Sequence, residues 1–252
     1  SWNKQKPKAV QLPTAIECLP CKQIRLGRFG KTNRQSMGIE RYIIPFVVVI
    51  LLRIKPIGTW LATINTFFHE GFHALTALLL GNKVKEIEFD QKLGGSCSSL
   101  STGKFKTFLT ALSGYTGCNL ISLILIYAIK HSRIEITFLI LAIFSLLIIV
   151  LYMRKPYALV WTLAFATANL ICYIIPFPLR IKAGILYTYI IAILVENTVA
   201  CFEILRLSFT NSKQSGDCSV LHKVSHIPPF LWAIIFNAIN ALTIYKIALM
   251  IL

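Results

Sequence analysis

Residues 65–75 read NTFFHEGFHAL and place two histidines and a glutamate inside an otherwise apolar stretch. Ionisable side chains are costly in hydrocarbon, so their presence in an apolar segment indicates a functional site. His69 and His73 are four residues apart, which puts both imidazoles on one helix face with Glu70 beside them. The stretch therefore predicts a membrane-embedded helix that carries a chemical site.

The rest of the chain has the composition of a membrane protein. Of its 252 residues 56% are hydrophobic and 14% are charged, whereas about a quarter of the residues in soluble domains are charged. We expect an all-α polytopic fold, a bundle of seven transmembrane helices, or six if the short first block does not cross completely. The apolar blocks fall at about 42–53, 57–80, 107–129, 134–152, 156–176, 183–206 and 228–251.

The basic residues predict the orientation of these blocks. Nineteen of the 26 Lys and Arg fall in segments on the same predicted side as the N-terminus, so the positive-inside rule places that terminus in the cytoplasm. Residues 1–40 are basic and lack hydrophobic periodicity, which is typical of a disordered cytoplasmic tail, and 41–252 form the transmembrane domain. The net charge of +16 indicates anionic lipid headgroups as partners; nucleic acid is not expected, because no Arg-rich stripe with interleaved aromatics occurs.

The segment HEGFH matches the pattern H-E-x-x-H. On a helix, imidazoles at positions i and i+4 converge on one zinc ion, and the adjacent glutamate serves as the general base. The alternative is a pair of histidines that only pack and hydrogen-bond inside the bundle. Three ionisable groups on one apolar helix favour the metal site, with His69 and His73 as ligands and Glu70 as the catalytic base.

A catalytic zinc requires a third protein ligand. The chain has only ten acidic residues, and those of the tail, the outer side and the loop directly after the motif are poorly placed. Three carboxylates towards the cytoplasmic side are left, and sidedness does not choose among them: Glu196, Glu203 and Asp217.

Three segments resemble site-2-protease-type intramembrane zinc metallopeptidases, in particular their shorter bacterial and fungal relatives. They are FFHEGFHALTALLLGNKVKEIEFDQKLGGSC (67–97), ALSGYTGCNL (111–120) and SGDCSVLHKVSHIPPFLW (215–232). The resemblance covers about residues 42–252. It implies a small β-hairpin at about 83–98, after the zinc-motif helix, and one Zn²⁺ per chain.

The same resemblance ranks Asp217 first as the third zinc ligand and Glu203 second, with Glu196 as a polar group beside the site. It also implies that the hairpin, with Ile87 and Phe89, holds a substrate segment in extended form by β-addition.

These observations predict an intramembrane zinc metalloendopeptidase that cuts membrane-protein substrates near the cytoplasmic face. One alternative is a catalytically silent relative that binds membrane proteins. Phe72 favours this alternative, because the family usually has glycine at the position before the second histidine. A transporter is a second alternative, but no inverted repeat is visible in the chain.

Overall fold

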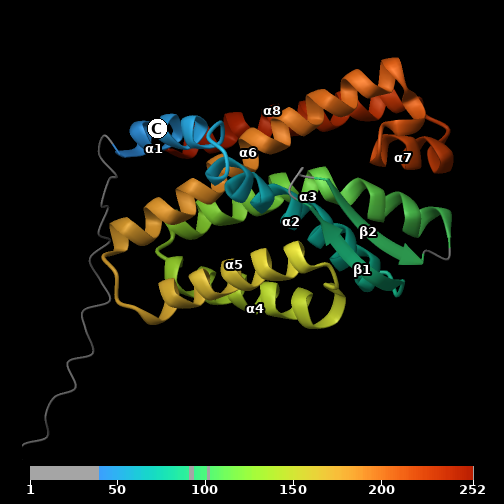
Figure 1. Ribbon diagram of the computed structural model, residues 1–252. Helices are drawn as coiled ribbons and strands as arrows, with labels where there is room; N and C mark the ends of the chain where they lie inside the picture. Colours follow the sequence, from blue (N-terminus) through green and yellow to red (C-terminus); the bar gives the residue numbers. More distant parts are fainter. Residues whose placement is uncertain (1–39, 91–93, 101–102, 252) are drawn as a thin grey trace, which may run out of the picture. The chain divides into compact units, whose positions relative to one another are not determined.

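The computed structural model describes residues 40–90, 94–100 and 103–251, which form eight α-helices, one 3₁₀ turn and one β-hairpin (Figure 1). The predicted tail, apart from Glu40, where α1 begins, lies outside the described residues. The elements in chain order are α1 (Glu40–Leu51), α2 (Ile57–Leu79), β1 (Lys83–Phe89), β2 (Gly95–Leu100), α3 (Lys104–Lys130), α4 (Ile134–Tyr152), α5 (Pro156–Ile174), α6 (Leu179–Thr210), η1 (Ser212–Gln214), α7 (Asp217–Ser225) and α8 (Pro229–Ile251).

Five of the described helices, α3, α4, α5, α6 and α8, are long and apolar enough to cross a membrane. Helix α2 has 23 residues and would be the sixth span by length. Helix α1 has only 12 residues, about 18 Å of helix, which is shorter than the hydrocarbon core of a bilayer. The predicted fold class, a polytopic helical bundle with a small hairpin after the motif helix, is confirmed.

Helix α2 lies at the centre of the bundle. It packs against α3 and α6 along its length and against both strands of the hairpin. Residues 62–68 are buried without interruption, as expected for a helix enclosed on all sides. Helices α4 and α5 form an antiparallel pair, and α8 lies along α6 (Figure 1).

Aromatic side chains fill the space between α2 and the α4–α5 pair. Phe67 packs against Phe144, Trp161 and Phe165 with ring centroids between 5.6 and 5.8 Å apart. Phe67 and Trp161 are each 1% exposed. Large aromatic groups at these separations contribute both buried area and edge-to-face contacts, so the helix that carries the motif has a rigid support.

The hairpin follows α2 directly. Strands β1 and β2 pair antiparallel, with a register shift between Val84 and Glu86. Ile87 and Phe89 of β1 are 0% and 3% exposed, and Phe89 packs against Tyr157 and Trp161 of α5. Ile87 also forms an isolated parallel bridge with Met153, so the second edge of β1 is partly used, whereas no backbone hydrogen bond among the described residues uses the second edge of β2.

Candidate metal centre

The two histidines of the motif converge as their spacing predicts. The Nε2 atoms of His69 and His73 are 3.1 Å apart, and the two rings are nearly perpendicular, at 89°. Both side chains are largely buried, with 15% and 9% of their surface exposed. Two imidazole nitrogens therefore meet in one small region inside the bundle.

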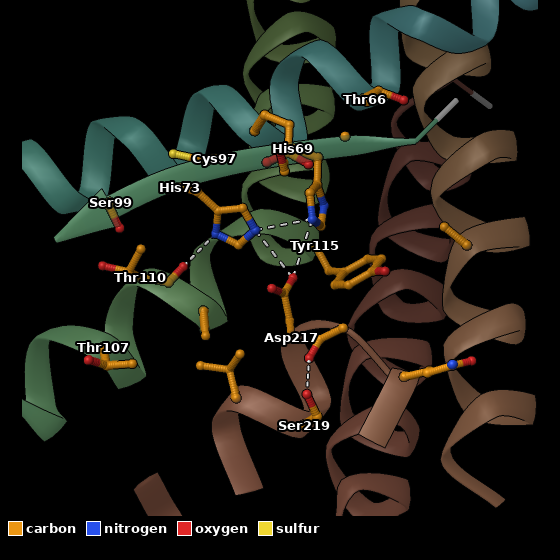
Figure 2. Close-up of a pocket in the computed structure, with 18 of the residues that line it drawn as sticks. Thr66, His69, His73, Cys97, Ser99, Thr107, Thr110, Tyr115, Asp217 and Ser219 are labelled. Atoms are coloured by element: carbon orange, nitrogen blue, oxygen red, sulfur yellow. Dashed lines mark hydrogen bonds and ion pairs between the residues drawn. The ribbon is translucent and has the colours of Figure 1, made fainter. Parts of the chain in front are cut away.

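Asp217 completes the cluster from a distant part of the chain. It is the first residue of α7, and its Oδ2 atom lies 3.3 Å from the Nε2 atoms of both His69 and His73 (Figure 2). The preceding residue, Gly216, has a φ of +51°, a conformation that L side chains rarely adopt. This glycine makes the turn that starts α7 with the Asp217 carboxylate facing α2.

A carbonyl oxygen of α3 orients one of the histidines. The Nδ1 atom of His73 is 2.6 Å from the backbone oxygen of Thr110, so the Nδ1–H donates to that oxygen and Nε2 is turned towards His69 and Asp217. Figure 2 shows Thr110 beyond His73, on the side away from Asp217. Hydrogen bonding of this kind at the second ring nitrogen is characteristic of histidines that bind metals.

Two further residues of α3 pack against the imidazoles. The ring of Tyr115 meets that of His69 edge to face, with centroids 4.5 Å apart. A Cβ atom at Gly114 would lie 2.5 Å from both Cε1 of His69 and Nε2 of His73. Only a residue without a side chain allows α3 this close to the cluster.

The donor set fits a zinc ion. Tetrahedral ligands about 2.05 Å from zinc lie about 3.3 Å from one another, and the three separations here are 3.1, 3.3 and 3.3 Å. In addition, Oδ2 of Asp217 is fully buried and makes no hydrogen bond. Nitrogen from two histidines and oxygen from one carboxylate is a usual catalytic zinc set, and it leaves one position open.

Asp217 is held in its charged form by the same neighbours. Burial alone would raise its pKa, but the charges and hydrogen-bonding capacity of His73 and His69 outweigh it and hold the pKa well below the ordinary value for aspartate. An ionised carboxylate is the form that binds a metal ion.

A cavity of about 810 Å³ opens beside the cluster. Its walls come from α2, β2, α3, η1 and α7, with one residue of α6. Cys97 of β2 lines it, but burial and then the negative charges of Glu70 and Asp217 raise its pKa to about 12, so it stays a neutral thiol at neutral pH. The space is large enough for several residues of an extended peptide.

Glu70 lies at the wall of this cavity next to His69. Its side chain is 5% exposed and forms no ion pair with any described basic residue. Gly95, the first residue of β2, packs so closely that a Cβ atom there would overlap the Oε1 atom of Glu70. The carboxylate therefore faces the space between the histidines and the start of β2.

The other predicted site residues lie away from the cluster. Glu203 is on α6, is half exposed and pairs with Arg206 at 2.6 Å, and neither it nor Glu196 lines the cavity. Of the three carboxylates that the sequence leaves open, only Asp217 is brought to the histidines. Ile87 and Phe89 of the predicted substrate site point into the core, and it is β2 that lines the cavity.

Sequence reasoning did not identify the α3 residues Thr110, Gly114 and Tyr115 as parts of the site. The only signal was the segment ALSGYTGCNL, whose glycines mark a close approach of α3 to α2 without saying which side chains they meet. Gly114 lies against the histidines and Gly117 against the ring of Phe72.

Comparison with known proteins gave one match. A family model described as Peptidase M50B-like matches residues 42–247. No curated protein and no solved structure matched the chain. The match covers every helix from α2 to α7 and most of α1 and α8, together with all residues of the cluster.

Proposed function

Because the chain belongs to the Peptidase M50B-like family, a family of site-2-protease-type zinc metallopeptidases, we propose that it is a zinc endopeptidase that cuts membrane-protein substrates within or beside the bilayer. The family match confirms the resemblance found in the sequence. The observation that carries the proposal is the convergence of His69, His73 and Asp217 at the separations of tetrahedral zinc ligands, next to Glu70.

His69, His73 and Asp217 would hold one zinc ion per chain. When bound, zinc supplies Lewis-acid chemistry that polarises a carbonyl group and lowers the pKa of water. The bond from His73 Nδ1–H to the Thr110 carbonyl fixes the orientation of one ligand, and the ring of Tyr115 limits rotation of the other.

Glu70 is the proposed general base and acid. Its carboxylate takes a proton from the attacking water and then gives a proton to the amine of the leaving peptide. The close contact with Gly95 excludes bulk water from one side of the carboxylate and confines it to the cavity wall. No other acidic side chain among the described residues that line the cavity is free for this role, since Asp217 faces the histidines.

Strand β2 is the proposed docking edge for the substrate. One edge of β2 pairs with β1, and no backbone hydrogen bond among the described residues uses the other edge. Gly95, Ser96, Cys97 and Ser99 line the cavity, so a substrate segment added to that edge would pass over the cluster. A transmembrane helix must unwind before its amides can be attacked, and pairing with β2 would hold it extended.

The orientation expected from the basic residues completes the proposal. With the N-terminus in the cytoplasm and α1 carrying the chain across the membrane, α2 runs inward and the cluster lies in the inner half of the membrane. The site would then cut near the cytoplasmic face, and the basic segments between helices would contact anionic headgroups.

Zinc content is the first test. The full chain, purified in detergent without chelators, should carry close to one zinc per polypeptide. Asp217→Asn should lose most of the metal, because a neutral amide is a poor zinc ligand, whereas Glu203→Gln should keep it. If Glu203→Gln lost the zinc and Asp217→Asn kept it, the ligand set would be wrong.

Cleavage is the second test. The probe is a single-span peptide of leucine and alanine with a fluorophore and a quencher at its two ends, reconstituted with the protein in liposomes. Glu70→Gln should keep zinc and lose cleavage by a factor of 10² or more. A wild-type protein that holds zinc but leaves a panel of such peptides intact would favour the silent relative instead.

A further inference from the structure

Asn65 carries a polar group that the fold does not use. The residue is on α2, is 7% exposed and lines the cavity beside the cluster. Its Oδ1 atom is fully buried without a hydrogen-bond partner. A carboxamide oxygen that is buried without a hydrogen bond loses its hydration and therefore lowers the free energy of unfolding.

Asn65 lies about one helical turn before His69 on α2. Residues 65, 69 and 73 are successive members of one i, i+4 row, so Asn65 lies on the same face of α2 as the two histidines. Four residues of helix rise by about 6 Å, which is close to the length of two residues in an extended chain. Figure 2 shows that Thr66, the neighbour of Asn65, lies at the opposite end of the site from Thr110.

An extended substrate has hydrogen-bonding groups on both edges. Under the proposed function, β2 takes one edge, and the N–H and C=O groups of the other edge must find partners in a site that excludes bulk water. A carboxamide presents an N–H₂ donor and a C=O acceptor in the same plane, as a peptide group does. Asn65 lines the cavity and carries such a carboxamide, so it can serve as a partner for that second edge.

We propose that Asn65 is a substrate-positioning residue whose carboxamide hydrogen-bonds the main chain of the substrate about two residues from the bond that is cut. The inference rests on the proposed function, because it needs a peptide that passes over the cluster. It also accounts for the unpartnered carboxamide oxygen in the ligand-free protein: its hydrogen-bond partner arrives with the substrate. Because this hydrogen bond involves only the main chain of the substrate, it would form with substrates of any sequence.

Three chelating probes test the inference on the zinc-loaded full chain in detergent. Two are peptide hydroxamates, one with Leu-Leu on the amino side of the hydroxamate and one with Leu-Leu on its carboxyl side. The third, acetohydroxamate, has the chelating group and no peptide. Affinities are measured by isothermal titration calorimetry, and zinc content and Tm are recorded for each variant.

Asn65→Leu should weaken one of the two peptide hydroxamates by about three- to tenfold, the value of one lost hydrogen bond. Acetohydroxamate affinity and zinc content should not change. The Tm should stay the same or rise, because the buried oxygen that is removed has no hydrogen-bond partner. A packing role would give the opposite result, a lower Tm with unchanged affinities.

Asn169→Leu is the matched control. Asn169 is a fully buried carboxamide on α5 whose Oδ1 atom also lacks a partner, although its Nδ2 atom donates to the backbone oxygen of Phe165, and it does not line the cavity. This variant should leave all three affinities unchanged. The inference is overturned if Asn65→Leu weakens neither peptide hydroxamate, or weakens acetohydroxamate to the same degree. A wild-type protein that binds neither zinc nor acetohydroxamate overturns the proposed function, and the role of Asn65 with it.

Discussion

Replacing Gly114 by alanine tests the geometry of the metal centre most directly. The new Cβ atom would lie 2.5 Å from Cε1 of His69 and from Nε2 of His73, whereas such atoms normally approach to about 3.5 Å. One ring must therefore move by about 1 Å, and zinc ligands tolerate about 0.2 Å. We expect zinc affinity to fall at least 100-fold, which corresponds to about 2.7 kcal/mol.

The assay is competition for zinc against a chelator of known affinity, with the full chain in detergent. Gly184→Ala on α6 is the matched control, because a Cβ atom there meets only Cδ1 of Ile44 at 3.7 Å. Both substitutions exchange glycine for alanine inside a helix, which favours the helix by about 0.5–1 kcal/mol. This gain offsets part of the overpacking cost in Gly114→Ala, about 1–3 kcal/mol, and is unopposed in Gly184→Ala. Zinc affinity equal to wild type in Gly114→Ala would refute the described packing of α3 against the histidines.

Three other predictions concern the proposed base Glu70, the ion pair between Lys182 and Glu135, and the proposed zinc ligand Asp217. Gly95→Ala should reduce peptide cleavage at least tenfold with zinc content unchanged, because its Cβ overlaps the Glu70 carboxylate; zinc loss would contradict this. Glu135→Gln leaves the ammonium of Lys182, 1% exposed and 3.0 Å from Glu135, buried without its partner. Since Glu135 is 66% exposed, we expect Glu135→Gln to lower the free energy of unfolding, measured with denaturant, by only about 1–2 kcal/mol. Lys182→Met should not lower it, because this substitution leaves no buried charge. Removal of zinc should speed amide exchange in α7 but not in α5, as measured by mass spectrometry; equal protection in both states would argue against coordination by Asp217.

Much of the fold could be predicted from the sequence because a bilayer leaves few options. Backbone groups in hydrocarbon must be paired within a helix, so apolar blocks and their proline boundaries mark the helices closely. The block predicted at 134–152 coincides with α4, and α5 begins at Pro156 as expected. The short first block was ambiguous because hydropathy does not say whether a 12-residue helix crosses or lies at the edge.

The site could be predicted only where local geometry decides it. His69 and His73 are one helical turn apart, so their convergence follows from the helix itself. Asp217 is 144 residues further along than His73, and its approach depends on how α3, α6 and α8 support α7. Residue types alone left Asp217, Glu203 and Glu196 open for that reason, and the family resemblance was needed to rank them.

The hairpin shows the same limit in another form. The family resemblance implied where its strands lie, but not which strand would face the cluster. Ile87 and Phe89 are two of the three apolar residues of β1 and are natural candidates for substrate contact, yet their hydrophobicity places them in the core, with Phe89 against α5. The residues of β2 that line the cavity are small, and hydrophobic periodicity does not predict which small residues face a site.

The metal centre joins two parts of the molecule that differ in rigidity. The histidines come from α2, whose residues 62–68 are buried without interruption, whereas Asp217 comes from a nine-residue helix that is too short to be stable alone. Helix α7 keeps its place because Cys218 and Leu221 are fully buried in a cluster with Trp232 and Phe236 of α8. Zinc affinity would therefore depend on the docking of α7, and by thermodynamic reciprocity bound zinc would strengthen that docking. Because η1 and α7 also form one wall of the cavity, the ion would fix the shape of the substrate site as well as supply its chemistry.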